Sequence, residues 1–426
     1  MKNKKETLLI LTILITICII IFNRDKLYEA KYIEPKDTLL AITINGEIST
    51  TFPTTAAYET SVKCTTGTGK VEWNGNKWVL TTSGITNGST KCNATFNQTL
   101  RQSILANNEV KTPITTPGAA VSTASEALLA STEDDYGTSY YFRGAVKNNY
   151  VEFANKCWRI VRISGDGSVK LILHNDNTTK KANPCDAANN SAAAAVVRWF
   201  TTNKREFNEK YDDNAYVGFK YGTPGSSTYE ATHANTNKST ILTNLEAWYD
   251  KDNLKDYEKV IADTVWCNDK SIVTDTTYDP WKMTPNGLGY AKNVTYYGAA
   301  QRLISTSGST GGTGPSLKCN GELSKINSKV GLITADELAY AGYAFNQINT
   351  TTYLQENATD AYFWWSLSPG DFGGYSAEVF GIYAGGGFSL KFVKDTYYEV
   401  RPSISLKSTT NVTGEGTSSS PFIISM

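Results

Sequence analysis

The stretch NNYVEFANKCWRIVRISGDGSVKLILH, residues 148–174, decides the fold of the larger part of the chain. Three short runs in it are rich in β-branched and aromatic residues, which favour strands. Asp166-Gly167, between the second and third runs, is typical of a tight hairpin turn. We therefore expect three successive antiparallel strands: Val151 to Phe153, Cys157 to Ile163 and Val169 to His174.

The middle run predicts which side chains face the core. Successive side chains on a strand point to opposite faces of the sheet. Trp158, Ile160 and Ile163 are expected on the buried face, and Arg159 and Arg162 on the opposite, solvated face. A half-buried antiparallel sheet is the expected result.

Downstream of these strands, apolar spacing indicates helices. In residues 192–211 and 239–254 apolar residues recur at helical spacing, and Ser239 is placed to cap the second helix. Thr334 and Glu337 have the spacing of a capping box, so a further helix should begin there. Strands and helices together predict an α+β unit. The two expected stripes are Ala195, Val196, Trp199 and Phe200, then Ile241, Leu242, Leu245 and Trp248.

A second informative stretch is YFWWSLSPGDFGGYSAEVFGIYAGGGFSLKF, residues 362–392. Strand alternation should bury at least one residue of Phe363 to Trp365, and packing is the expected role of Trp364 and Trp365. Asp371, after Pro369-Gly370, is most simply a turn residue. Aromatic faces and carboxylates on a glycine-rich backbone nevertheless suit contact with a sugar or a protein. The candidate ligand-binding residues are Asp371, Tyr375, Glu378 and Tyr383.

The residues before the α+β unit predict separate segments. Residues 28–105 contain short Thr- and Val-rich runs separated by Gly and Asn, which predict a small all-β sandwich acting as a stalk. Residues 106–133 are rich in Thr, Pro, Ala and Ser and are predicted to be a spacer, with a possible short helix from Ala124 to Ala130. The α+β head is expected over 134–407, and a turn and a strand over 408–426.

The N-terminus, residues 1–27, predicts a membrane anchor. Leu8 to Phe22 is an uncharged apolar run between a lysine-rich start and Arg24. A cleaved signal peptide is the alternative, but no small-x-small cleavage site follows. We therefore expect a cytoplasmic stub, an uncleaved signal anchor and a single-pass cell-membrane protein whose C-terminal bulk is extracellular.

Composition limits the partners and the redox compartment. Lys+Arg and Asp+Glu both number 41 in 426 residues, so no overall positive field attracts nucleic acid. Apart from Cys18, the chain has an even number of cysteines, as expected in an oxidising space. Sequence alone allows 15 pairings; pairing of consecutive cysteines is the simplest. The expected disulfide cysteines are Cys64, Cys92, Cys157, Cys185, Cys267 and Cys319.

No catalytic or metal site is predicted. The sequence has no HExxH, GxSxG, P-loop, GxGxxG or EF-hand pattern, and the absence of CxxC argues against zinc. His174 and His233 are the only histidines and stand in no triad-like context. Paired acids such as Asp371 and Glu378 could hydrolyse glycosides, whereas Asp336 and Glu337 suit a helix N-terminus.

The order of several motifs resembles a known family. These motifs are CWRIVRISGDGSVKLIL, TVWCND, YYGAAQRL with SLKC, GLITADELAYAG, YFWWSLSPGDF and VRPSISLK, over roughly residues 136–407. They resemble the C-terminal region of anchored surface proteins of low-GC gut bacteria, a domain related to the C-type-lectin-like and formylglycine-generating-enzyme fold. The resemblance implies a C-type-lectin-like head with a loop-rich binding face, and it favours a bridge between Cys267 and Cys319.

The sequence also lacks several motifs of that family. The catalytic cysteine pair of the formylglycine-generating enzyme has no counterpart here, so no copper oxidase activity is implied. The EPN and WND calcium signatures of sugar-binding lectins are absent, because Cys267 interrupts the run from Trp266 to Asp269. No cofactor is therefore predicted, and calcium is not supported by a motif.

Together these observations predict a membrane-anchored extracellular binding or adhesion protein that recognises a glycan or a protein through loops of its head. The alternatives are a carboxylate-dependent glycan hydrolase and a purely structural envelope protein. Binding is preferred over catalysis, because the polar residues form no acid–base constellation while the Tyr-, Trp-, Asn- and Gly-rich loops suit contact.

Overall fold

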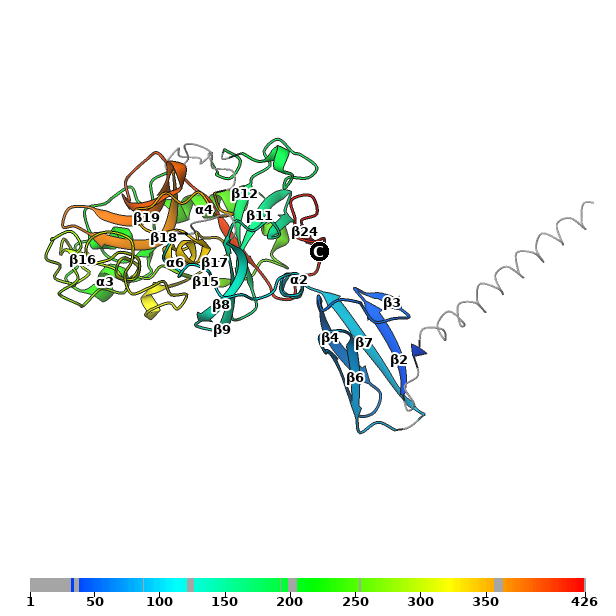
Figure 1. The fold of residues 1–426 in the computed structure, drawn as a ribbon. Coiled ribbons are helices and arrows are strands. Elements are labelled where there is room, and N and C mark those ends of the chain that lie inside the picture. Colours follow the sequence, from blue (N-terminus) through cyan, green and yellow to red (C-terminus); the bar gives the residue numbers. More distant parts are fainter. Residues whose placement is uncertain are drawn as a thin grey trace, which may run out of the picture. The chain divides into compact units, whose positions relative to one another are not determined.

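A computed structural model describes residues 32–33, 38–86, 88–120, 126–191, 193–197, 205–252, 254–355 and 363–424. The chain divides into two compact units, Met1–Ala106 and Asn107–Met426 (Figure 1). Strands are the main element of both units, and the helices are few and short.

The first unit packs a sheet against a hairpin. Strands run in the order β1-β2-β7-β4, with β3 beside β2, and β5 pairs with β6. The core between them contains Leu40, Ile42, Val71, Trp78 and Phe96. The elements are β1 (Tyr32–Ile33), β2 (Thr38–Ile44), β3 (Glu47–Ser49), β4 (Tyr58–Cys64), β5 (Thr68–Trp73), β6 (Trp78–Ser83), β7 (Thr90–Gln98) and α2 (Leu100–Asn107).

The described residues form disulfides between Cys64 and Cys92, Cys157 and Cys185, and Cys267 and Cys319. Disulfide bonding is therefore confirmed, and each bond joins consecutive cysteines. Cys64 and Cys92 lie directly opposite each other on the antiparallel strands β4 and β7. That bond joins two strands of one sheet rather than two sheets, which explains why the cysteines are so close in the sequence.

The larger sheet of the second unit contains the three strands predicted from residues 148–174. They are β10, β11 and β12, in a sheet of order β22-β12-β11-β10-β24-β23, with β9 paired to β11 and β8 to β9. Its strands are β8 (Ala127–Asp134), β9 (Gly137–Gly144), β10 (Tyr150–Phe153), β11 (Lys156–Ile163), β12 (Val169–Asn175), β22 (Ser403–Leu406), β23 (Val412–Thr413) and β24 (Phe422–Ile424).

The second sheet of this unit is built mainly from residues 363–392. Its order is β16-β18-β19-β20, with β21 parallel to β18. The strands are β16 (Thr295–Tyr296), β18 (Phe363–Phe372), β19 (Ala377–Tyr383), β20 (Gly387–Phe392) and β21 (Tyr398–Glu399). Two small ribbons complete the strands: β13 (Lys220–Tyr221) with β14 (Asn237–Lys238), and β15 (Thr264–Cys267) with β17 (Lys325–Ser328).

The helices of the second unit are α3 (Tyr229–His233), α4 (Thr240–Lys251), α5 (Gly298–Leu303) and α6 (Ala335–Ala341). Two predicted starts are correct: the Ser239 hydroxyl accepts a hydrogen bond from the Leu242 N–H of α4, and Thr334 and Glu337 form a capping box at α6. The helix predicted over 192–211 is wrong in its described part. Residues 193–195 form a turn, and Val197 then pairs with Val400 as an isolated bridge, so this apolar segment is not a helix there.

The predicted fold class needs correction. Strands make up 37% of the structure and helices 15%, so it is mostly β, not an α+β C-type-lectin-like head on a β-sandwich. The helical stretches expected from apolar periodicity either are short or pair with strands. Local propensity is a weak guide where sheet contacts compete with it.

The predicted membrane anchor and single-pass localisation also need correction. No helix in the described ranges is long and apolar enough to cross a membrane. The 12-residue α4 is only ~18 Å long, against a hydrocarbon core of ~30 Å. The apolar run Leu8 to Phe22 lies outside the described residues.

The expectation of a solvated face with Arg159 and Arg162 is wrong. Arg159 is fully buried, with its Nε 2.7 Å from Asn149 Oδ1 and its guanidinium 3.8 Å from the centre of the Tyr150 ring. The strand register shifts between Ile160 and Arg162. Both faces of β11 are covered by other parts of the unit, so a polar residue at alternate positions did not indicate solvent.

The stretch predicted to be a spacer contributes to the second unit. Its β8 strand includes part of the segment considered for a short helix. The Glu126 carboxylate accepts hydrogen bonds from the Thr115 N–H and from the buried Arg143 side chain. Arg143 in turn donates to the carbonyls of Ala339 and Tyr340 at the end of α6. The Thr- and Pro-rich composition did not indicate this packing, because it depends on the buried ion pair between Glu126 and Arg143.

Candidate functional site

Four residues form a row across one face of the second sheet. Tyr296 on β16 lies opposite Asp371 on β18, Asp371 lies opposite Glu378 on β19, and Glu378 lies opposite Phe392 on β20. Directly opposed residues point to the same face, with Cβ atoms ~4.5–5.5 Å apart. Two carboxyl groups are thereby held side by side between two aromatic rings.

A bulge places Asp371 on that face. The register of β18 with β19 shifts between Pro369 and Asp371, which is where a strand can accept proline. Gly370 allows close packing at this point, because a Cβ there would lie 2.1 Å from Leu390 Cδ2. The expectation that Asp371 is a turn residue is therefore wrong: it is a strand residue with 3% of its surface exposed.

Two exposed aromatic side chains lie beside the row. Trp281 contacts Tyr296, with ring centres 5.6 Å apart, and Tyr375 lies 6.3 Å from the Phe392 ring. Trp281 is 37% exposed and Tyr375, at the β18–β19 turn, is 66% exposed. Asp279 holds the Trp281 loop, since its carboxylate accepts from the Met283 N–H and the Tyr296 hydroxyl.

These side chains line a cavity of about 520 Å³. That volume is within the usual range for small-molecule sites, ~300–1,000 Å³. The carboxyl pair contributes to its polar part together with Asn346 and Ser389, and Trp281 and Tyr375 lie at the Tyr296 and Phe392 ends of the row. The lining residues that matter below are Trp281, Phe345, Asn346, Asp371, Tyr375 and Glu378.

The carboxyl pair lacks direct contacts with cations and hydrogen-bond donors among the described residues. Within the described part of the chain, no N–H or O–H group donates a hydrogen bond to the Asp371 or Glu378 carboxyl group, and neither forms an ion pair. Burial and the neighbouring Glu378 hold the pKa of Asp371 well above its usual range. Burial also raises the pKa of Glu378 to about 7, although Lys391 opposes the shift. Like charges in this register destabilise a sheet.

The structure brings together three of the four predicted ligand-binding residues. Asp371, Tyr375 and Glu378 line the cavity, but Tyr383 does not. The Tyr383 ring packs on Gly387, its cross-strand partner, and Lys391 Nζ lies 5.2 Å from the ring centre. Tyr383 is five residues from Glu378 on the same strand, so alternation alone places it on the opposite face.

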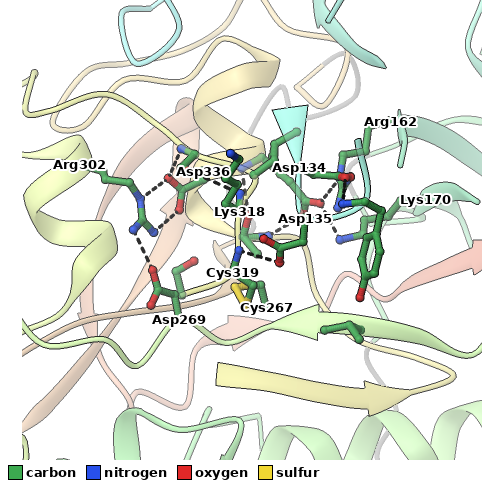
Figure 2. A pocket seen from close by; sticks show the side chains of 17 residues that line it. Asp134, Asp135, Arg162, Lys170, Cys267, Asp269, Arg302, Lys318, Cys319 and Asp336 are labelled. Atoms are coloured by element: carbon green, nitrogen blue, oxygen red, sulfur yellow. Dashed lines mark hydrogen bonds and ion pairs between the residues drawn. A yellow bond between two sulfur atoms is a disulfide. The ribbon is translucent and has the colours of Figure 1, made fainter. Parts of the chain in front are cut away.

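A second cavity, of about 40 Å³, is surrounded by charged side chains. Figure 2 shows Arg302 between Asp336 and Asp269, with distances of 2.7 Å from Nε to Asp336 Oδ1 and from Nη1 to Asp269 Oδ2. Arg162 and Lys170 both contact Glu337 Oε1, at 2.8 Å and 2.6 Å. This space is sufficient for only one or two water molecules. Because the charges satisfy one another, we assign this cluster to stability.

The remaining sequence candidates have structural positions. Glu337 and Asp336 begin α6, as predicted for a helix N-terminus. His174 and His233 are both buried, and burial holds the pKa of each well below its usual range. No group of three or more metal-ligating side chains occurs among the residues that the structure describes.

Sequence reasoning missed Trp281, Phe345 and Asn346. Trp281 stands in the turn-forming run Tyr278 to Met283, and a single aromatic residue in a loop is no signal of a site in the sequence. Phe345 and Asn346 follow α6, and their sequence contains no signal of a site either. They reach the cavity only through tertiary packing, in which Phe345 lies against Phe380.

Comparisons with known proteins provide no independent assignment. No family model matches the chain, and no curated protein or solved structure shows significant similarity to it. The resemblance to surface proteins of low-GC bacteria stays a prediction.

Proposed function

We propose that the protein binds a glycan in the cavity over β16, β18, β19 and β20. The observation that carries the proposal is a buried carboxyl pair that lacks protein donors, between the exposed rings of Trp281 and Tyr375. Aromatic faces pack against the apolar faces of sugar rings, and carboxyl oxygens accept hydrogen bonds from sugar hydroxyls. The lining combines the aromatic side chains of Trp281, Phe345 and Tyr375 with polar groups that can fix the orientation of a ligand.

A glycan hydrolase is supported less well. Two neighbouring acids with raised pKa values are a feature of active sites. The carboxyls of a glycoside hydrolase, however, flank the scissile bond, one on each side. Asp371 and Glu378 are direct cross-strand neighbours on one face, so both approach a bound ring from the same side.

Binding to a glycan array by the full-length protein tests the proposal. We expect at least one saturable glycan, and a loss of affinity of about 10-fold in each of the variants Trp281→Ala and Tyr375→Ala, which is ~1.4 kcal/mol. The reason is that each substitution removes a ring from one side of the cavity. Affinities of the variants should be measured by calorimetry on the glycan found.

Tyr397→Ala is the matched control, since Tyr397 is 54% exposed but does not line the cavity. Its affinity should equal that of the unsubstituted protein. A folded protein that binds no glycan would instead favour the structural role. Release of reducing ends from the bound glycan, abolished by Glu378→Gln, would favour the hydrolase.

A further inference from the structure

We infer that the sugar bound in this cavity carries a free ammonium group, which lies between the carboxyl groups of Asp371 and Glu378. This inference rests on the proposed glycan binding and specifies the class of sugar: a de-N-acetylated amino sugar rather than a neutral or acetylated one. It follows from the charges around the cavity and from the ion pairs that most other buried carboxylates of the second unit form.

Most buried carboxylates elsewhere in the second unit have a cation of the described residues within contact distance; Asp213, which accepts from two backbone N–H groups, and Glu206 do not. Arg143 is 2.9 Å from Glu126, and Arg302 and Arg162 contact the acids around α6. Lys156 Nζ is 2.6 Å from Asp176 Oδ1. These pairs offset the large free-energy cost of removing a charge from water. The pair in the cavity lacks such a cation among the described residues.

Lys391 is the cation that opposes the raised pKa of Glu378, but the two side chains form no ion pair. Lys391 lies opposite Val379 on β19, one position away from Glu378, so its side chain starts on the other face of the sheet. There its Nζ lies over the Tyr383 ring. No cation of the described residues contacts the pair, so protons reduce its charge in the free protein and a ligand ammonium group can take their place.

The geometry favours an ammonium group over a metal ion or a neutral hydroxyl. Calcium requires six to eight oxygen ligands, and two carboxyls alone are too few. A hydroxyl can donate one hydrogen bond but brings no charge, whereas an ammonium group donates three hydrogen bonds and supplies the missing positive charge. Exposed aromatic rings beside the pair add cation–π attraction.

The sugar ring itself is assigned from the shape of the cavity. A volume of about 520 Å³ exceeds what a lone ammonium group fills, and Trp281 and Tyr375 lie on its two sides. A lysine side chain also carries an ammonium group, but its flexible chain has no ring that could pack against Trp281 and Tyr375. A peptide amine is therefore the outcome to be tested against the amino sugar.

The test is calorimetric titration of the full-length protein at neutral pH and low salt with three probes. They are the β-1,4-linked glucosamine tetramer, its fully N-acetylated counterpart and N-α-acetyl-lysine amide. We expect the glucosamine tetramer to bind at least 10-fold more tightly than either of the others. Its affinity should fall with added salt, because the contact is between opposite charges.

Substitutions separate charge from shape. Asp371→Asn and Glu378→Gln should each lower affinity for the glucosamine tetramer at least 10-fold more than they lower affinity for the acetylated tetramer. Equal or tighter binding of the acetylated tetramer would overturn the inference while glycan binding stood. Tightest binding of the lysine derivative would overturn the sugar assignment. Failure to bind any glycan would overturn the proposed function as well.

Discussion

Glu337→Gln should lower the free energy of unfolding by about 3 kcal/mol at pH 7. The Glu337 carboxylate is buried and accepts from Arg162, from Lys170 and from the Thr334 N–H. Glutamine can keep the helix cap, but it removes the negative charge that two buried cations share. Urea unfolding, followed by tryptophan fluorescence, measures the difference.

A matched control separates this effect from the loss of any ion pair. Glu246 on α4 contacts Lys238 Nζ at 2.5 Å, but both side chains are well exposed. Exposed pairs contribute only ~0–1 kcal/mol, so Glu246→Gln should change stability little. Equal effects of the two substitutions would contradict a stabilising role for the buried ion pairs of Glu337 with Arg162 and Lys170.

The same carboxylate predicts instability in acid. Although burial acts in the other direction, Lys170 and Arg162 lower the pKa of Glu337 to about 2. An acid with a lowered folded pKa stabilises the fold above its unfolded pKa and loses that contribution as pH falls through the folded value. The unfolding free energy should thus fall between about pH 4.5 and pH 2, and Glu337→Gln should flatten this fall.

Strands and caps could be predicted from the sequence because their signals are local. The Asp166-Gly167 turn and its flanking runs gave β11 and β12 with nearly correct ends. The spacing from Thr334 to Glu337 gave the start of α6. Burial of charged residues was harder to predict from the sequence. Arg143 and Arg159 are buried because residues distant in the sequence accept their hydrogen bonds, and no local pattern indicates those partners.

The candidate site also combines features that the sequence predicts with features that depend on long-range contacts. Asp371 and Glu378 could be selected as residues of interest, but their opposition depends on the bulge at Pro369 and on the register of β18 with β19. Trp281 reaches the row through β16, far from it in sequence. Long-range register, which sequence periodicity does not contain, therefore assembles the cavity.

Asp371→Asn should stabilise the protein at pH 8, by about 1–3 kcal/mol, and leave its stability at pH 4 nearly unchanged. Burial raises the pKa values of both Asp371 and Glu378, and the neighbouring Glu378 raises that of Asp371 further. An acid with a raised folded pKa stabilises the fold below its unfolded pKa, and the contribution is lost as pH rises through the folded value. Thermal unfolding from pH 4 to pH 9 measures the curve.

The double variant Asp371→Asn, Glu378→Gln should have the flattest curve between pH 4.5 and pH 8. Glu230→Gln, at an exposed position on α3, should keep the pH dependence of the unsubstituted protein. A less stable Asp371→Asn at pH 8 would mean that the ionised pair is structurally satisfied, in contradiction to the site as described. If Asp371→Asn is more stable but binds the ligand more weakly, the two opposed acids reduce the stability of the fold and are needed for ligand binding.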